Sequence, residues 1–195
     1  MRLTYNKNHV GDVLLVTLKG ATNPEYTHLD GVTVIKDNGE TVGLNIFDAS
    51  EKFSEDTLNS ELGNEAALEE INTVLEKAGR EKITPDLSPK FVVGYVLTRE
   101  DHPDATRLNV TTVDVGEETL QIVCGAKNVD KGQKVVVAKP GAVMKNGLYI
   151  KPSELRGVES NGMICSKREL GLPQEEDGIY VLPESYNVGD EFKAE

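Results

Sequence analysis

The stretch LRGVESNGMICS, residues 155–166, combines side chains suited to holding a phosphate-bearing ligand. Arg156 carries a planar guanidinium whose fork of donors matches the oxygens of a phosphate group. Ser160 can donate a hydrogen bond to a phosphate or a ribose hydroxyl, and Met163 offers a flexible apolar contact. The glycine at position 157 lets another backbone approach closely. The stretch is therefore a candidate surface for an anionic polymer.

Each of these side chains also has a purely structural interpretation. Arg156 could cover the mouth of a barrel with its aliphatic stem, and Ser160 could bond its own turn. Met163 begins an apolar run and could belong to the core. The residue types alone leave both interpretations open.

The charge around this stretch differs from that of the whole chain. The 195 residues hold 21 basic and 33 acidic residues, a formal net charge of −12, which repels phosphate on average. Residues 125–168 hold nine basic and three acidic residues, a local net charge of +6. A ligand responds to the local field, so this segment, called the basic island below, favours an anionic partner. The alternative is a solvated lysine-rich face that protects a sheet edge. The basic residues of the island are Lys127, Lys131, Lys134, Lys139, Lys145, Lys151, Arg156, Lys167 and Arg168.

Catalytic, metal and cofactor sites are not expected. The two cysteines, Cys124 and Cys165, sit in short apolar runs and are expected to be buried reduced thiols. The three histidines are scattered without metal-ligand spacing, and the sequence has no phosphate loop or nucleophile elbow. No apolar run is long enough to cross a bilayer and no signal-peptide pattern is present, so a cytoplasmic protein is expected.

The first part of the chain predicts a small α+β domain over residues 1–85. Strands are expected at 12–20, 32–37 and 41–47, with an Asn-Gly hairpin signal between the last two. Residues 64–79 place apolar side chains at helical spacing, with Asn64 to cap the start. Two prolines and mixed charge over 80–90 indicate a linker.

The second part, residues 90–192, predicts an all-β domain. Closely spaced β runs with a longer insertion before the fifth fit a small OB-fold barrel, although their periodicity is equally compatible with a sandwich. The expected strands are 91–99, 107–115, 119–125, 134–139, 162–166, 177–184 and 188–192.

Three separated motifs in this part resemble a known RNA-binding domain. HPDA (102–105), CGAKN (124–128) and LRGVESNGM (155–163) occur in the order and at the distances of the tRNA-binding domain of the phenylalanyl-tRNA synthetase β subunit, also found in EMAP-II-type proteins. The full chain is similar to stand-alone bacterial tRNA-binding proteins that carry an extra N-terminal domain. The resemblance covers residues 90–192. It implies an OB-fold, tRNA as partner without catalysis, and frequent dimerisation; the N-terminal residues lie outside the synthetase resemblance.

Carried onto this sequence, the resemblance places the RNA-binding surface on seven residues. They are Lys127, Asn128, Lys139, Lys151, Arg156, Ser160 and Met163. Asn128 has the alternative role of capping a turn, and His102 is expected to shape its loop rather than to touch ligand. Two departures weaken the match: residues 104–107 read DATR where the family commonly has NADK, and Glu154 replaces a frequent lysine beside Arg156.

Two functions therefore compete at the level of sequence. The first is a non-catalytic tRNA-binding protein that grips the RNA backbone and selects shape, since an aromatic content of 5% without tryptophan leaves few rings for base stacking. The second is a protein-interaction module that docks on an aminoacyl-tRNA synthetase or another translation partner without binding RNA. The net charge of −12 and Glu154 favour the second.

Overall fold

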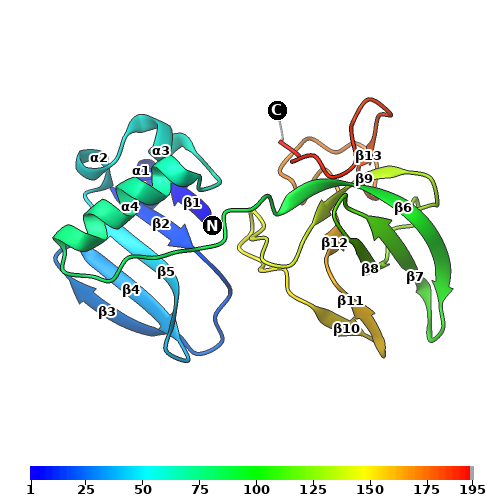
Figure 1. The fold of residues 1–195 in the computed structure, drawn as a ribbon, viewed down its shortest axis with the longest axis horizontal. Helices are drawn as coiled ribbons and strands as arrows, with labels where there is room; N and C mark the ends of the chain where they lie inside the picture. The colour runs from blue at the N-terminus through cyan, green and yellow to red at the C-terminus, as the bar shows by residue number, and fades with distance from the viewer. Residues whose placement is uncertain (194–195) are drawn as a thin grey trace. The chain divides into compact units, whose positions relative to one another are not determined.

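A computed structural model describes residues 1–193 of the chain. The chain divides into two compact units, Met1–Ser88 and a second that begins at Pro89 (Figure 1). Within the described residues, no helix is long and apolar enough to cross a membrane.

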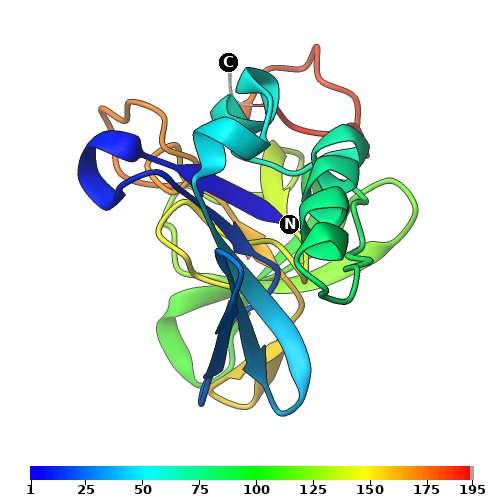
Figure 2. The same ribbon diagram turned by 90° about the vertical axis from the view of Figure 1, so that its left-hand side faces the viewer.

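A five-stranded antiparallel sheet with short helices and one long helix forms the first unit. Its strands are β1 (Arg2–Tyr5), β2 (Val13–Thr17), β3 (Glu25–Leu29), β4 (Val32–Asp37) and β5 (Glu40–Phe47), in the order β1-β2-β5-β4-β3. Its helices are α1 (Lys7–Val10), α2 (Ala49–Lys52), α3 (Glu55–Asn59) and α4 (Glu65–Lys77). Figure 2 shows α4 along one face of the sheet.

The local signals of the sequence explain two of these elements. Asn38 and Gly39 have φ of 49° and 82°, which gives β4 and β5 the two-residue turn expected from an Asn-Gly pair. The Asn64 side chain accepts from the Ala67 N–H at 2.9 Å and caps α4, as predicted. Ile71 of the helix is fully buried in a core shared with the sheet.

The sequence predicted a linker over residues 80–90, but the start of this stretch belongs to the first unit in the structure. Both backbone groups of Ile83 bond the Asn72 side chain, at 2.8 Å for the Ile83 N–H and 3.0 Å for its carbonyl. Ile83 is 8% exposed and belongs to the core of the first unit. Its apolar side chain therefore ties the start of the 80–90 stretch to that unit.

Antiparallel strands form the second unit, as predicted. They are β6 (Phe91–His102), β7 (Ala105–Asp114), β8 (Thr119–Cys124), β9 (Lys134–Ala138), β10 (Ser153–Leu155), β11 (Val158–Ser160), β12 (Met163–Ile164) and β13 (Val181–Leu182). The main sheet follows the path β12-β9-β6-β7-β8, with β13 also on β9, while β10 and β11 form a separate hairpin.

The arrangement is OB-like, but the strand pairing does not close a barrel. Among the described residues no ladder joins β8 to β12, and the backbone link near this gap is the Asn161 N–H to the Gln121 carbonyl at 2.7 Å. The expected strand at 188–192 is reduced to one bridge between Glu191 and Val92. The predicted OB-fold barrel is therefore found as an OB-like arrangement of strands, which no strand ladder closes among the described residues.

Both cysteines are free and buried, as predicted. Cys165 is fully buried, and burial raises the pKa of its thiol to about 12. Burial also raises the pKa of the Cys124 thiol above its ordinary value. The thiolate is the reactive form of cysteine, and a raised pKa keeps both thiols protonated. Both side chains therefore act as small apolar residues of the core.

Candidate nucleic-acid interface

The segment that carries Arg156 forms the hairpin β10–β11, called the arginine hairpin below. Its register pairs Ser153 with Ser160 and Leu155 with Val158, so a two-residue turn of Arg156 and Gly157 joins the strands. Figure 1 shows this hairpin at the lower edge of the second unit. The sequence predicted no strands here. The arginine therefore lies at the tip of an arm rather than in an irregular loop.

The turn holds Arg156 in an unfavourable backbone conformation. Its φ is 46° and that of Gly157 is 82°, the pair of positive values that a type I′ turn requires. Asparagine, aspartate and glycine adopt this region readily, whereas the left-handed conformation costs another residue about 1–2 kcal/mol. Arg156 is fully in the exposed class, so burial of its stem does not compensate for the strain. Strained backbone conformations of this kind cluster at functional sites.

Strand β8 anchors the root of the arginine hairpin. Ser160 is 2% exposed and its hydroxyl accepts from the Val123 N–H at 3.0 Å. The Gln121 side-chain amide donates to the Glu159 carbonyl at 2.8 Å. The position of Ser160 fits the structural alternative, since its hydroxyl is occupied inside the fold. Ser160 can therefore affect a ligand only indirectly, by holding the arginine hairpin in place.

A groove of about 600 Å³ adjoins that root. Val123, which bonds Ser160, also lines the groove, so the arginine hairpin and the groove share a border. Lys127 and Met163 both face it. The structure therefore brings together two predicted site residues that are 36 positions apart. The full lining is Val123, Cys124, Gly125, Ala126, Lys127, Met163, Ile164, Ser166, Arg168, Glu169, Gln174, Asp177, Gly178 and Ile179.

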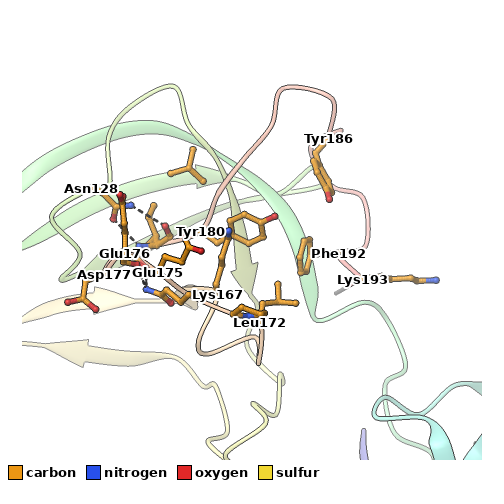
Figure 3. A pocket seen from close by; sticks show the side chains of 15 residues that line it. Asn128, Lys167, Leu172, Glu175, Glu176, Asp177, Tyr180, Tyr186, Phe192 and Lys193 are labelled. Carbon is orange, nitrogen blue, oxygen red and sulfur yellow. Dashed lines mark hydrogen bonds between the residues drawn. The ribbon is translucent and has the colours of Figure 1, made fainter. Parts of the chain in front are cut away.

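Asn128 fixes one wall of the groove. Its side-chain oxygen accepts from the Ile179 N–H at 2.9 Å and its amide donates to the Ile179 carbonyl at 3.1 Å. A Cβ on Gly178 would stand 2.3 Å from the Asn128 oxygen, so this close approach depends on glycine. Figure 3 shows a neighbouring pocket, which Asn128 lines together with the acidic side chains of Glu175, Glu176 and Asp177.

The basic island is divided between paired and unpaired cations. Lys139 forms an ion pair with Glu118 at 2.9 Å, and Arg168 forms one with Asp177 at 3.3 Å. Within residues 1–193, Lys127, Lys151 and Arg156 form no ion pair and lie in the exposed class. Lys127 lines the groove, Arg156 is at the tip of the arginine hairpin and Lys151 lies two residues before its first strand, so no carboxylate of the described residues neutralises these three cations of the predicted site.

Sequence reasoning missed Arg168 and the anchors of the hairpin. Arg168 lines the groove, and in the sequence it stood out only as one charge of the basic island. His102 is 5% exposed and bonds the Leu155 carbonyl at 3.0 Å, which no local pattern reveals across 53 positions.

Comparisons with known proteins found a matching family model and similar proteins. A family model described as "Putative tRNA binding domain" matches residues 91–191. The chain is 50% identical over 200 residues to a protein of Bacillus subtilis named "Putative tRNA-binding protein YtpR", covering 99% of this chain and 100% of that one. It is 53% identical over 130 residues to the phenylalanine--tRNA ligase β subunit of Oceanobacillus iheyensis, covering 62% of this chain but only 16% of the ligase subunit. A solved MetRS related protein from Pyrococcus horikoshii aligns with TM-score 0.41 and 28% identity, over 53% of this chain and 88% of that one.

Proposed function

The chain belongs to the family that carries this tRNA-binding domain, and we propose from that membership that it binds tRNA without catalysing a reaction. The observation that supports a binding site most strongly is Arg156, exposed at a hairpin tip in a strained conformation. An arginine kept where asparagine or glycine would be more stable indicates that the guanidinium has a role outside the fold.

The proposed binding surface consists of the groove and the arginine hairpin. Lys127, Lys151 and Arg156 contact phosphates directly, and Met163 packs against a ribose or base at the groove. Ser160 and Asn128 hold the two parts in place through their bonds to Val123 and Ile179. Lys139 joins the surface only if RNA displaces Glu118, because a phosphate and a carboxylate compete for the same ammonium group.

Recognition is proposed to rest on backbone and shape. None of the residues that line the groove in the described part of the chain is aromatic, so stacking of successive bases has no platform there. Strand β11 extends by about 7 Å from Ser160 to Val158 and the turn lies beyond it, so the groove and the hairpin tip can contact phosphates at separate points of a folded RNA. The acids that rim the groove repel polyanions which lack that arrangement.

The same proposal covers the setting of the protein. In this proposal residues 1–85 form a separate α+β domain, and residues 90–192 form the tRNA-binding domain. The protein is located in the cytoplasm. The ligase subunits among the relatives carry a similar segment, which makes an aminoacyl-tRNA synthetase a candidate partner. A homodimer would double the number of phosphate contacts.

The test replaces Arg156 with asparagine. Arg156→Asn creates the turn sequence that type I′ geometry prefers, so the hairpin keeps or gains stability while the guanidinium is lost. We expect tRNA affinity to fall by about 5- to 30-fold, the equivalent of roughly 1–2 kcal/mol for a charge-assisted hydrogen bond. Lys82→Ala, which removes an exposed positive charge from the first unit, is the control and should bind as the parent chain does.

Two outcomes would contradict the proposal. If Arg156→Asn binds tRNA with the same affinity as Lys82→Ala, the hairpin is not the site. If the partners captured from lysate persist unchanged after ribonuclease treatment while purified tRNA fails to bind, the domain is a protein-interaction module.

A further inference from the structure

We propose that His102 is a positioning residue of the tRNA site, which acts by fixing the backbone that presents Arg156. This inference rests on the proposed function of the arginine hairpin. His102 ends β6 and is 5% exposed, whereas Arg156 is exposed at the tip of the arginine hairpin. Its imidazole joins two hairpins, β6–β7 and β10–β11.

The hydrogen bonds of His102 determine its tautomer. The Asp104 backbone N–H lies 3.1 Å from Nδ1, and a backbone amide can only donate. Nδ1 must therefore be the unprotonated nitrogen, which leaves the ring proton on Nε2. Nε2 lies 3.0 Å from the Leu155 carbonyl oxygen and donates to it. The neutral ring satisfies both bonds at once.

The acceptor of that bond is the residue immediately before Arg156. Leu155 closes the two-residue turn together with Val158. Fixing the Leu155 carbonyl fixes the direction in which the chain enters the turn, and hence the direction of the arginine side chain. The Nε2 bond anchors β10, as the hydrogen bonds of Gln121 and Ser160 anchor β11.

The arginine hairpin needs these anchors because its strands are short. Each strand has three residues, and an isolated two-stranded hairpin is at best marginally stable in water. Its turn also carries the unfavourable φ of Arg156. Without the His102 bond, β10 would be ordered only on binding, and that ordering would reduce affinity.

The test compares His102→Leu with His102→Gln. The glutamine amide can donate from the position of Nε2, whereas leucine fills the space without a donor. The rate of amide hydrogen exchange in the peptide that spans 153–160 measures how well the arginine hairpin is ordered in the absence of RNA. We expect faster exchange there in His102→Leu, partial protection in His102→Gln, and unchanged exchange in α4 of the first unit. Thermal unfolding of each variant confirms that it folds.

A double-mutant cycle with Arg156→Asn connects the positioning to binding. We expect His102→Leu to weaken tRNA binding by about three- to tenfold, the range for one lost hydrogen bond, with partial rescue in His102→Gln. In the Arg156→Asn background the same change should have no further effect, since no guanidinium remains to be positioned.

The outcomes separate this inference from the proposed function. Unchanged exchange over 153–160 in His102→Leu overturns the positioning role, whatever tRNA does. Equal losses of affinity with and without Arg156 also overturn it, because His102 would then act on the fold in general. If exchange responds but Arg156→Asn itself binds tRNA normally, the proposed site is wrong, and the role of His102 in tRNA binding is overturned with it.

Discussion

Glu154 stands beside the arginine hairpin tip, and reversing its charge should strengthen tRNA binding. The register places Glu154 directly opposite Glu159, and both are exposed. Two like charges that face each other across an antiparallel pair are unfavourable by roughly 0.2–1 kcal/mol. Glu154→Lys converts this repulsion into an attraction, so the hairpin should not lose stability.

The gain in binding follows from the distance to Arg156. Two residues of extended strand separate position 154 from 156 by about 7 Å. At that distance in water one unit charge and a phosphate interact by about 0.6 kcal/mol, so a change of two charge units amounts to about 1.2 kcal/mol without screening. With a Debye length of about 8 Å the value falls to about 0.5 kcal/mol. We expect about a twofold gain in affinity at physiological salt and about an eightfold gain at low salt.

The assay is a tRNA titration of Glu154→Lys at two salt concentrations, with Glu117→Lys as control. Glu117 is also exposed and lies in the turn between β7 and β8, so the control changes the net charge of the chain equally. Equal gains in the two variants would mean that only total charge matters. That result would refute the assignment of the arginine hairpin as the site, as would no gain at all.

Two further predictions concern the stability and the thiols of the chain. Hydrogen bonds from the Ser50 hydroxyl and backbone, at 2.6 and 2.9 Å, and from Tyr5 hold the pKa of Asp12 well below its ordinary 3.8. The lowered pKa means that ionised Asp12 stabilises the fold above about pH 3.8 and that this contribution is lost as pH falls further. Asp12→Asn should therefore lower Tm at pH 7, with a difference that narrows below pH 3.8. For Cys165, a pKa of about 12 leaves a thiolate fraction of roughly 10⁻⁴ at pH 8. A thiol reagent should label neither cysteine in the native protein at pH 8 and both in urea.

Each of these predictions has an opposing result. A Tm difference between the parent chain and Asp12→Asn that stays constant down to pH 2 would show that the stability added by Asp12 does not depend on its ionisation. Native labelling of Cys165 at the rate of a free thiol would show that the second unit opens readily around its core.

The sequence correctly predicted the elements that are determined by residues adjacent in the chain. The Asn-Gly turn at 38–39 and the Asn64 cap were found because each depends on neighbouring residues. The arginine hairpin was missed because its strands have three residues and Arg156 stands where asparagine is typical. Strand β3 was missed because all five of its residues are exposed, so no alternation of apolar residues marks it.

The sequence predicted the positive charge of the candidate site but not the side-chain contacts within it. The basic island correctly located cations around the groove, since charge can be counted in sequence. The pairing of Lys139 with Glu118 joins residues 21 positions apart, and the Asn128 bonds reach across 51. Such contacts arise only when strands meet, and they decide which polar groups remain available to a ligand.

The salt dependence of tRNA binding by the parent chain tests most directly whether a local basic surface outweighs a net charge of −12. The proposed surface has three unpaired cations (Lys127, Lys151 and Arg156), and Lys139 and Arg168 can be released from ion pairs, so log affinity should fall with log salt at a slope of about −2 to −4. Binding that is tight and independent of salt would contradict the account.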